Sequence, residues 1–295
     1  MSTVTMTKPA KSTAPGSRRV RRRRDPGKWI VLVLFIVLAV VMLIPFGIVL
    51  INAMKTPAEY AQHGPLSLPR GVSTQGVKNF WDQVDFGQKL WNSFLIAGLV
   101  SVFAVLLSIL NAYALGIGKV KGRTWVLVLF LVCNTLPQEG LVYPLYYLAK
   151  QLGLYDSKWS VIIIFTVIQS AFGTYLFSSV LSTFPKEILE AAEMDGAGKW
   201  RALWRVVVPV SRPTITVMFV FFFIWTWNEF FIPMIMLISN DNQTVPIALG
   251  VTAGDKMMDA TLQSSASLLG LLPAVIFFLI FQRTLSRGIT AGAVK

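Results

Sequence analysis

The sequence predicts an all-α membrane protein with six transmembrane helices, and three observations support this prediction. The first is composition, since 54% of the 295 residues are hydrophobic and only 14% are charged; in a soluble globular domain about a quarter are charged. The second is a set of six long apolar runs. The third is the uneven distribution of Lys and Arg among the segments that separate these runs.

Each apolar run is long enough to cross a bilayer, because a helix of about 20 apolar residues spans about 30 Å of hydrocarbon. The runs cover residues 29–51, 90–117, 124–149, 159–181, 206–238 and 264–282. The fifth run is longer than one span requires. We therefore expect it to start or end off the bilayer normal, or to contain an interfacial turn at residues 209–213.

The first run follows a basic segment, as the apolar part of a signal peptide does. It is too long for a signal peptide, and no small-residue cleavage site closes it, so we predict an uncleaved first span. Residues 1–27 are rich in Ser, Thr, Pro and Arg and cannot bury a core. The predicted organisation is therefore a disordered tail over residues 1–27 and a membrane domain over residues 28–295.

Basic residues set the predicted orientation of the spans. If the N-terminus lies inside the cell, 20 of the 27 Lys and Arg residues fall in segments that are then cytoplasmic. Cytoplasmic loops of membrane proteins carry such an excess, so both termini are expected in the cytoplasm. The long segments 52–89 and 239–263 would then be available to an extracytoplasmic partner.

The net charge of +13 does not indicate a nucleic-acid-binding protein. Six arginines lie in residues 18–24, directly before the first apolar run, where basic residues act first as a topology signal. No basic surface with interleaved aromatic residues follows, which excludes nucleic acid as a partner. The one histidine, His63, has no second His or Cys with which to bind a metal. The single cysteine, Cys133, is expected to be a small core residue.

The loop between the fourth and fifth runs, residues 185–213, is the most informative segment for function. Pro185 suits the first position of a helix, and Glu187 favours the positive end of the helix dipole. One face of this helix carries, at helical spacing, Ile188, Ala191 and Ala192. Gly196 and Gly198 then allow a sharp turn.

A second amphipathic stretch follows the two glycines. Its predicted apolar stripe consists of Trp200, Leu203, Trp204 and Val207. The whole loop is thus predicted as a short helix, a glycine elbow and another short helix. Amphipathicity alone leaves two interpretations open: a protrusion inserted into the groove of a partner, or a hairpin that lies on the membrane surface.

The residue pattern of this loop favours the first interpretation. The stretch Glu190-Ala191-Ala192-Glu193-Met194-Asp195-Gly196-Ala197, with Pro209 thirteen residues beyond Gly196, closely resembles the EAA motif of ABC importer permeases. In that family the loop forms coupling helices that seat in a cleft of the ATP-binding cassette subunit. The resemblance implies a coupling role for Glu190, Ala191, Ala192, Asp195, Gly196, Ala197 and Pro209. It also implies a type I ABC importer permease architecture, with the coupling loop in the cytoplasm.

The resemblance covers nearly the whole chain and is most similar to the carbohydrate-uptake branch, specifically the second permease of the maltose-importer type. The segments that carry it are Asn92-Ser93-Phe94, Asn111-Ala112-Tyr113-Ala114-Leu115, Tyr143-Pro144-Leu145-Tyr146, Leu152-Gly153-Leu154, Trp227-Asn228-Glu229-Phe230, Gln282-Arg283 and Ala291-Gly292-Ala293-Val294-Lys295. The Arg-rich tail departs from the family pattern, which does not require it.

The chain has no G-x-x-x-x-G-K-[ST] phosphate cradle, so energy must come from a partner. No cofactor is expected in this chain, because the partner ATPase would bind ATP and Mg²⁺. The resemblance implies a transport subunit, not an enzyme, in a prokaryotic cell membrane. The implied partners are a second homologous permease, two ATP-binding cassette subunits, an extracytoplasmic solute-binding protein and a sugar. The implied mechanism is alternating access driven through the coupling loop.

Two carboxylates, Glu139 and Glu229, lie inside predicted spans. A charge in the bilayer costs roughly 2.5–3.5 kcal/mol on insertion scales, so each should face the bundle interior or water. Near Glu229, Trp225 and Asn228 add the aromatic face and planar amide that bind sugars. These four residues are the candidate substrate path. Polar residues in spans also serve helix packing, however, and packing is the favoured interpretation for most of them.

Three other classes of protein remain as alternatives at this point. A secondary transporter driven by an ion gradient would need an ion-binding cluster and would leave the EAA-like loop unexplained. A membrane enzyme would need a convergent nucleophile, base or metal set, which one His, one Cys and scattered acids do not provide. A structural scaffold would not depend on the glycine elbow for ATP-driven uptake.

Overall fold

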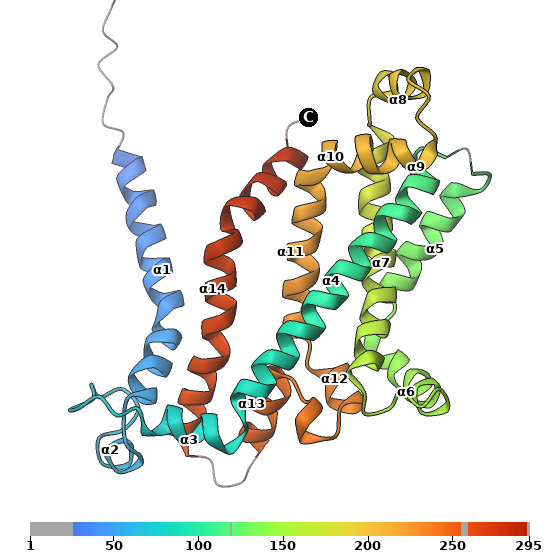
Figure 1. Cartoon of the computed structure of the whole chain (residues 1–295). Coiled ribbons are helices and arrows are strands. Elements are labelled where there is room, and N and C mark those ends of the chain that lie inside the picture. The colour runs from blue at the N-terminus through green and yellow to red at the C-terminus, as the bar shows by residue number, and fades with distance from the viewer. Residues whose placement is uncertain (1–25, 119, 255–258, 294–295) are drawn as a thin grey trace, which may run out of the picture. The chain divides into compact units, whose positions relative to one another are not determined.

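The computed structural model describes residues 26–118, 120–254 and 259–293, and every element in these ranges is a helix (Figure 1). The chain divides into two compact units, Met1–Phe46 and Gly47–Lys295. The first unit contains most of α1 (Pro26–Ala53), whose apolar residues are not gathered on one face, as expected of a helix surrounded by lipid. Nearly all of the predicted tail lies outside the described residues.

Four helices are long and apolar enough to cross a membrane. They are α1, α4 (Phe86–Gly116), α7 (Lys158–Ser182) and α14 (Ala260–Ala293). They correspond to the first, second, fourth and sixth apolar runs. The third and fifth runs are each broken into a bent pair of helices. The prediction of a single continuous helix is wrong for the third run, whereas a turn was among the expectations for the fifth.

The third run breaks at Leu136 and Pro137. It forms α5 (Arg123–Thr135), the 3-10 helix η1 (Gln138–Leu141) and α6 (Val142–Gln151), with a bend of 93°. A proline removes a backbone donor and disfavours helical geometry in the residue before it, which explains why α5 ends here. Leu136 is extended, with ψ of 132°. Cys133, on α5, is exposed and is not the core residue that the sequence predicts.

The fifth run bends by 78° at Ser211, within the turn predicted at residues 209–213. Its helices are α9 (Lys199–Ala202), the π-helix η2 (Leu203–Val207), α10 (Val208–Val210) and α11 (Arg212–Asn228). Pro213 suits the first turn of α11, where the missing N–H has no helical acceptor. The run then breaks again, because Glu229 is extended and the short α12 (Phe231–Met236) follows.

The shorter elements of the Gly47–Lys295 unit lie at the two ends of its long helices. They are α2 (Pro57–His63), α3 (Gln75–Gln83), α8 (Lys186–Met194), η3 (Asn240–Asn242) and α13 (Val245–Gly254). Figure 1 shows α8, α9 and α10 together at one end, and α6, α12 and α13 at the opposite end. The unit therefore presents two separate faces at which partners could bind.

The core of this unit lies where α4 and α7 pack along each other and against α11. Small residues allow the helices to approach closely, as in many membrane bundles. A Cβ added at Gly173 of α7 would lie 2.8 Å from Cζ of Phe222 on α11, and it would also meet the Ser108 side chain of α4. The Ser108 hydroxyl donates to the Ala104 carbonyl (2.6 Å), so its polarity is satisfied within its own helix.

We expect Gly173→Leu to destabilise the bundle by about 1–3 kcal/mol, the usual cost of overpacking a close helix contact. The measurement is the midpoint of thermal unfolding of the purified chain in detergent. Gly98→Leu is the matched control, because nothing lies within 4 Å of a Cβ added at Gly98 on α4. Equal midpoints for the two variants would contradict the packing role of Gly173.

Candidate functional site

The loop after α7 has the predicted form of a helix, a glycine elbow and a second helical stretch. In α8, Pro185 is the N-cap and Lys186 the first helical residue, one position later than predicted. The helix ends in a left-handed turn at Gly196, with φ of +74°. The Gly196 N–H donates to the Glu193 carbonyl (2.9 Å) and the Ala197 N–H to the Ala192 carbonyl (2.9 Å). A glycine at this position is the usual helix terminator because it lacks a Cβ.

The second stretch does not keep its predicted stripe on one face. Leu203 and Val207 are buried, whereas Trp200 is 66% exposed and Trp204 is 42% exposed. The π-helical turn η2 begins at Leu203 and places more residues in one turn than an α-helix, so the α-helical spacing of Leu203, Trp204 and Val207 is not kept. Trp200 precedes this turn, in α9. The stripe is therefore divided into a buried aliphatic pair and an exposed aromatic pair.

The buried pair anchors the loop to the bundle. Leu203 and Val207 pack in one cluster with Ile109 of α4 and Phe177 of α7. The Tyr113 hydroxyl of α4 donates to the Lys199 carbonyl at 3.1 Å. Burial of each large aliphatic side chain contributes about 1.5–3 kcal/mol. A force applied to the loop therefore acts directly on the ends of α4 and α7.

Most of the residues with predicted coupling roles lie on the outer side of this anchored loop. Those that are exposed are Glu190, Ala191, Asp195 and Gly196. Ala192 is buried, and Ala197 and Pro209 are half-buried. The shared face predicted for the first helix is thus incomplete, because Ile188 is also exposed. The projecting part of the loop combines small side chains with negative charge.

The second candidate site lies where α11 ends. The Trp225 indole N–H donates to Oε1 of Glu229 at 2.9 Å, and the Glu139 carboxylate is close enough to interact electrostatically with Glu229. Trp225 also packs against Phe172 of α7 and Phe221, with ring centroids 6.2 and 5.8 Å away. Two of the four predicted substrate-path residues, Trp225 and Glu229, therefore come together beside an aromatic cluster, with Glu139 within electrostatic range of Glu229.

Neither carboxylate lies inside a continuous spanning helix, which corrects the expectation from the apolar runs. Glu139 is exposed and lies in η1, directly after the break at Pro137. Glu229 is half-buried and is the extended residue that ends α11. A helix break leaves backbone groups without helical partners, and such irregular backbone in a membrane protein normally lines protein or water.

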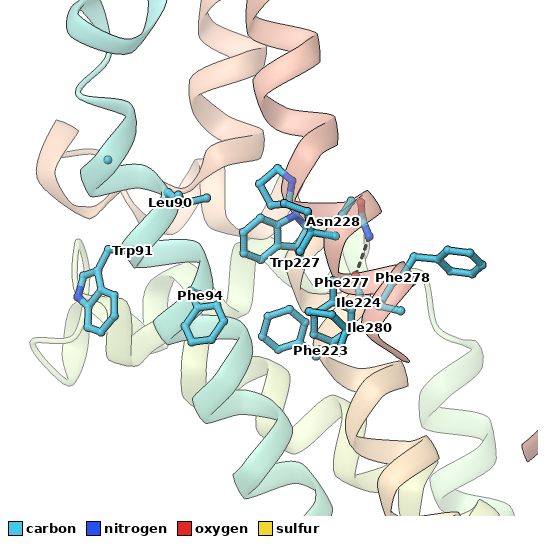
Figure 2. Close-up of a pocket in the computed structure, with 14 residues that line it drawn as sticks. Leu90, Trp91, Phe94, Phe223, Ile224, Trp227, Asn228, Phe277, Phe278 and Ile280 are labelled. Carbon is cyan, nitrogen blue, oxygen red and sulfur yellow. Dashed lines mark hydrogen bonds between the residues drawn. The ribbon is translucent and has the colours of Figure 1, made fainter. Parts of the chain in front are cut away.

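The fourth predicted residue, Asn228, belongs to a different surface. Its side-chain amide donates to the Ile224 carbonyl at 2.7 Å, and it borders a cavity of about 660 Å³ between α4, α11 and α14 (Figure 2). The lining is almost wholly apolar. Phe223 stacks with Phe277 at 4.2 Å between ring centroids, and with Trp227 at 5.8 Å. Asn228 therefore does not join Trp225 and Glu229.

A polar network at the other end of the bundle was not predicted as a site. The segment between α12 and α13, with the first residue of α13, forms hydrogen bonds with two other parts of the chain. One is the start of α4, through Lys89, Asn92 and Ser93, and the other is Asp156, which precedes α7. The sequence offers one signal, because Lys89 and Asn92 are polar residues at the start of an apolar run. Asn92 and Ser93 also belong to the quoted family motif, for which no role was predicted. In the described residues no group of His, Cys, Asp or Glu could hold a metal ion.

Comparison with known proteins identifies the chain. Residues 105–291 match the family of binding-protein-dependent transport system inner membrane components. The chain belongs to this family. It is 30% identical to the inner membrane ABC transporter permease protein YcjP of Escherichia coli, over 87% of this chain and 92% of that protein. It is 26% identical to the melibiose/raffinose/stachyose import permease protein MelC of Bacillus subtilis, over 94% of this chain and 100% of MelC.

A solved structure shares the fold. It is a chain from a bacterial ABC transporter involved in the import of the acidic polysaccharide alginate, with a TM-score of 0.77 and 21% identity, covering 88% of this chain and 97% of that chain. The predicted all-α importer-permease architecture is confirmed. The family consists of membrane components of transport systems, so the chain is a transport subunit and not an enzyme.

We expect the connection between Asp156 and the segment after α12 to weaken in acid. The Ser239 hydroxyl, followed by the backbone N–H of Ser239, the Asn242 amide and the N–H of Ile238, holds the pKa of Asp156 below its ordinary value, against partial desolvation. A carboxyl with a lowered pKa stabilises the structure while ionised. That stabilisation is complete above the ordinary pKa and is lost as pH falls through the lowered one.

The measurement is the fluorescence anisotropy of a dye on Ile238→Cys, in a Cys133→Ser background, during acid titration from neutral pH. Anisotropy should fall as Asp156 becomes protonated. The same titration in an Asp156→Asn variant should show no such step, because its side chain does not titrate. A step of the same size in that variant would assign the transition to another group.

Proposed function

We propose that this chain is the permease subunit of a sugar importer, and that a separate ATP-binding cassette subunit drives it through the α8–α10 loop. The observation that carries the proposal is the shape of that loop. It is a projecting helix that ends in a left-handed glycine, with exposed small and acidic residues, and its base is packed on α4 and α7. The family membership supports the need for such a partner.

The proposed orientation places both termini and the α8–α10 loop in the cytoplasm. It rests on the excess of Lys and Arg in the segments that would face the cytoplasm. The opposite end, with α6, α12 and α13, would then face the extracytoplasmic solute-binding protein (Figure 1). The proposed complex contains a second homologous permease and two cassette subunits, which bind ATP and Mg²⁺.

The proposed coupling residues are Glu190, Ala191, Ala192, Asp195, Gly196, Ala197 and Pro209. The exposed Ala191 allows a partner to approach the backbone of α8 closely, and the acidic side chains add a charge that a basic groove would recognise. Ala192 is buried and lies on the inner face of α8, away from the surface that a partner would contact. Movement of the cassette subunit would pull this surface and, through Leu203 and Val207, the ends of α4 and α7.

The proposed substrate is a sugar, and the proposed path includes Trp225, Glu229 and Glu139. An indole face beside carboxylates offers both the stacking surface and the hydrogen-bond acceptors that sugars require. MelC is a permease for melibiose, raffinose and stachyose, which makes such α-galactosides suitable first probes. Asn228 is a weaker candidate, because it borders the separate apolar cavity.

Gly196→Pro should block assembly with the cassette subunit or uncouple ATP hydrolysis from uptake. Proline fixes φ near −65°, whereas the elbow has φ of +74° at this residue. The measurements are co-purification of the cassette subunit and ATP-dependent uptake in proteoliposomes that contain the complete transporter. Gly153→Pro is the matched control, because Gly153 also has a positive φ (+67°) but lies outside the loop.

The control should still bind the cassette subunit. Normal ATP-dependent uptake by the Gly196→Pro variant would refute a coupling role for the elbow. Uptake driven by an ion gradient, with no ATPase present, would refute the proposed function as a whole.

Trp225→Ala should lower the uptake of labelled melibiose or raffinose by roughly tenfold, which corresponds to about 1.4 kcal/mol and to the loss of one good aromatic contact. Binding of the cassette subunit should not change, because Trp225 lies in the last turn of α11 and not among the exposed residues of the α8–α10 loop. Trp125→Ala is the control, since Trp125 is 78% exposed on α5. An equal loss of uptake in both variants would show that Trp225 has no specific place in the path.

A further inference from the structure

The segment between α12 and α13, residues 237–244, is a largely exposed loop that is held in one conformation; we call it the α12–α13 connector. Residues 238–241 are exposed, yet hydrogen bonds fix this backbone from two sides. Exposed loops usually have few fixed contacts and are among the more mobile parts of a protein. The number and the source of these bonds therefore require an explanation.

The first side is formed by the beginning of α4. The Lys89 ammonium donates to the Asn240 carbonyl at 2.7 Å. The Asn92 amide donates to the carbonyls of Asp241 (2.7 Å) and Gln243 (2.9 Å). Lys89 and Asn92 are fully buried. A buried ammonium or amide is costly unless it is hydrogen-bonded, so these side chains stabilise the connector only in this conformation.

The second side is formed by Asp156, two residues before α7. Its Oδ1 accepts the backbone N–H groups of Ile238 and Ser239, each at 2.9 Å. The Ser239 hydroxyl donates to Oδ2. The Asn242 amide also donates to the Asp156 carbonyl at 2.6 Å. In the opposite direction, the Asp156 N–H donates at 3.0 Å to the carbonyl of Met236, the last residue of α12. One residue thus binds the connector through both its side chain and its backbone.

The geometry of Asp156 itself is specialised for these contacts. Its φ is +59°, in the left-handed region, where Asp is tolerated better than most residues because its short side chain can bond locally. Here the carboxylate is directed to the connector and not to its own turn. Hydrogen bonds to an ionised acceptor contribute more than neutral ones, about 1.5–3 kcal/mol each when well made.

The two helices that hold the connector also hold the α8–α10 loop at their other ends. The helix α7 runs from Lys158 to Ser182 without a break, which corresponds to about 37 Å of straight helix. Only three residues separate its end from α8. The helix α4 begins beside Lys89 and carries Ile109 and Tyr113, which contact the loop. Each helix is therefore a rigid link between the two ends of the unit.

We infer that Asp156 is a positioning residue that fastens the α12–α13 connector to α7, so that displacement of the α8–α10 loop by the cassette subunit reaches the connector at the opposite face. The inference rests on the proposed function. It assigns the transmission of this displacement to the hydrogen bonds between Asp156 and the connector. These bonds can be removed by mutation without changing the α8–α10 loop or the proposed sugar path. The connector then moves with α7 as one body, and the face that would meet the solute-binding protein changes with the nucleotide state.

The test uses the complete transporter in nanodiscs, with a Cys133→Ser background and one dye at either end of α7. One preparation carries the dye on Ile238→Cys in the connector, and the other on Ser182→Cys at the end of α7. Both residues are exposed. Trapping with ATP and vanadate should change the dye emission at both positions. With Asp156→Ala, the change at residue 182 should persist and the change at residue 238 should be lost.

Two further variants separate positioning from simple stability. Asp156→Asn keeps an Oδ1 that accepts the two backbone N–H groups, so it should retain most of the response at residue 238. The double variant Ser239→Ala/Asn242→Ala removes the side-chain partners of Asp156 but keeps the two backbone N–H bonds to Oδ1, so it should reduce the response, even where Asp156→Ala fails to assemble. Asp82→Asn removes an exposed carboxylate of α3, outside the network, and should respond as the unmodified transporter does.

The outcomes distinguish this inference from the proposed function. An undiminished response at residue 238 in Asp156→Ala, or in the double variant, would overturn the inference and leave the proposed function intact. No response at either dye in the otherwise unmodified transporter would instead count against the proposed function. Equal loss at both dyes in the Asp156 variants would indicate general destabilisation and would also overturn the inference.

Discussion

The close contact of α4 with α7 is the constraint on which the rest of the Gly47–Lys295 unit depends. Gly173 leaves no room for a side chain between α7, Ser108 of α4 and Phe222 of α11, so the three helices share one continuous interface. The two candidate functional features sit on this interface. The α8–α10 loop packs against one end of α4 and α7 through Leu203 and Val207. The α12–α13 connector is hydrogen-bonded at the opposite end of these helices.

Whereas the continuous helices form the packed interface, the breaks in the apolar runs place carboxylates at positions where a continuous helix would not hold them. The break at Pro137 brings Glu139 into a 3-10 turn, and the end of α11 releases Glu229 from helical geometry. The two carboxylates come from segments 90 residues apart in the chain, and Glu139 is still within electrostatic range of Glu229, which accepts from Trp225. In the proposed mechanism the rigid helices transmit displacement, whereas the breaks between them supply the groups that contact a solute.

Much of the fold could be predicted from the sequence, because hydropathy and helix length report directly on bilayer spans. Four of six runs are single helices, and the glycine elbow at Gly196 is where the local pattern puts it. The break at Leu136 and Pro137 was missed because a hydropathy average treats both residues as part of an apolar run. The exposure of Trp204 was missed because a π-turn has no distinct sequence signal. The network of Asp156 joins residues more than 80 positions apart, a distance that local patterns do not reach.

The last turns of α11 carry two tryptophans with different surroundings. Trp225 and Trp227 are two residues apart, and at about 100° per residue their side chains point about 200° apart around the helix. One belongs to the surface with Glu229, and the other to the apolar cavity with Phe223 (Figure 2). A rotation of α11 about its own axis would therefore replace the polar surface that carries Glu229 with the apolar surface that carries Phe223. The same helix end could hold a hydrated solute in one state of the transporter and exclude water in the next.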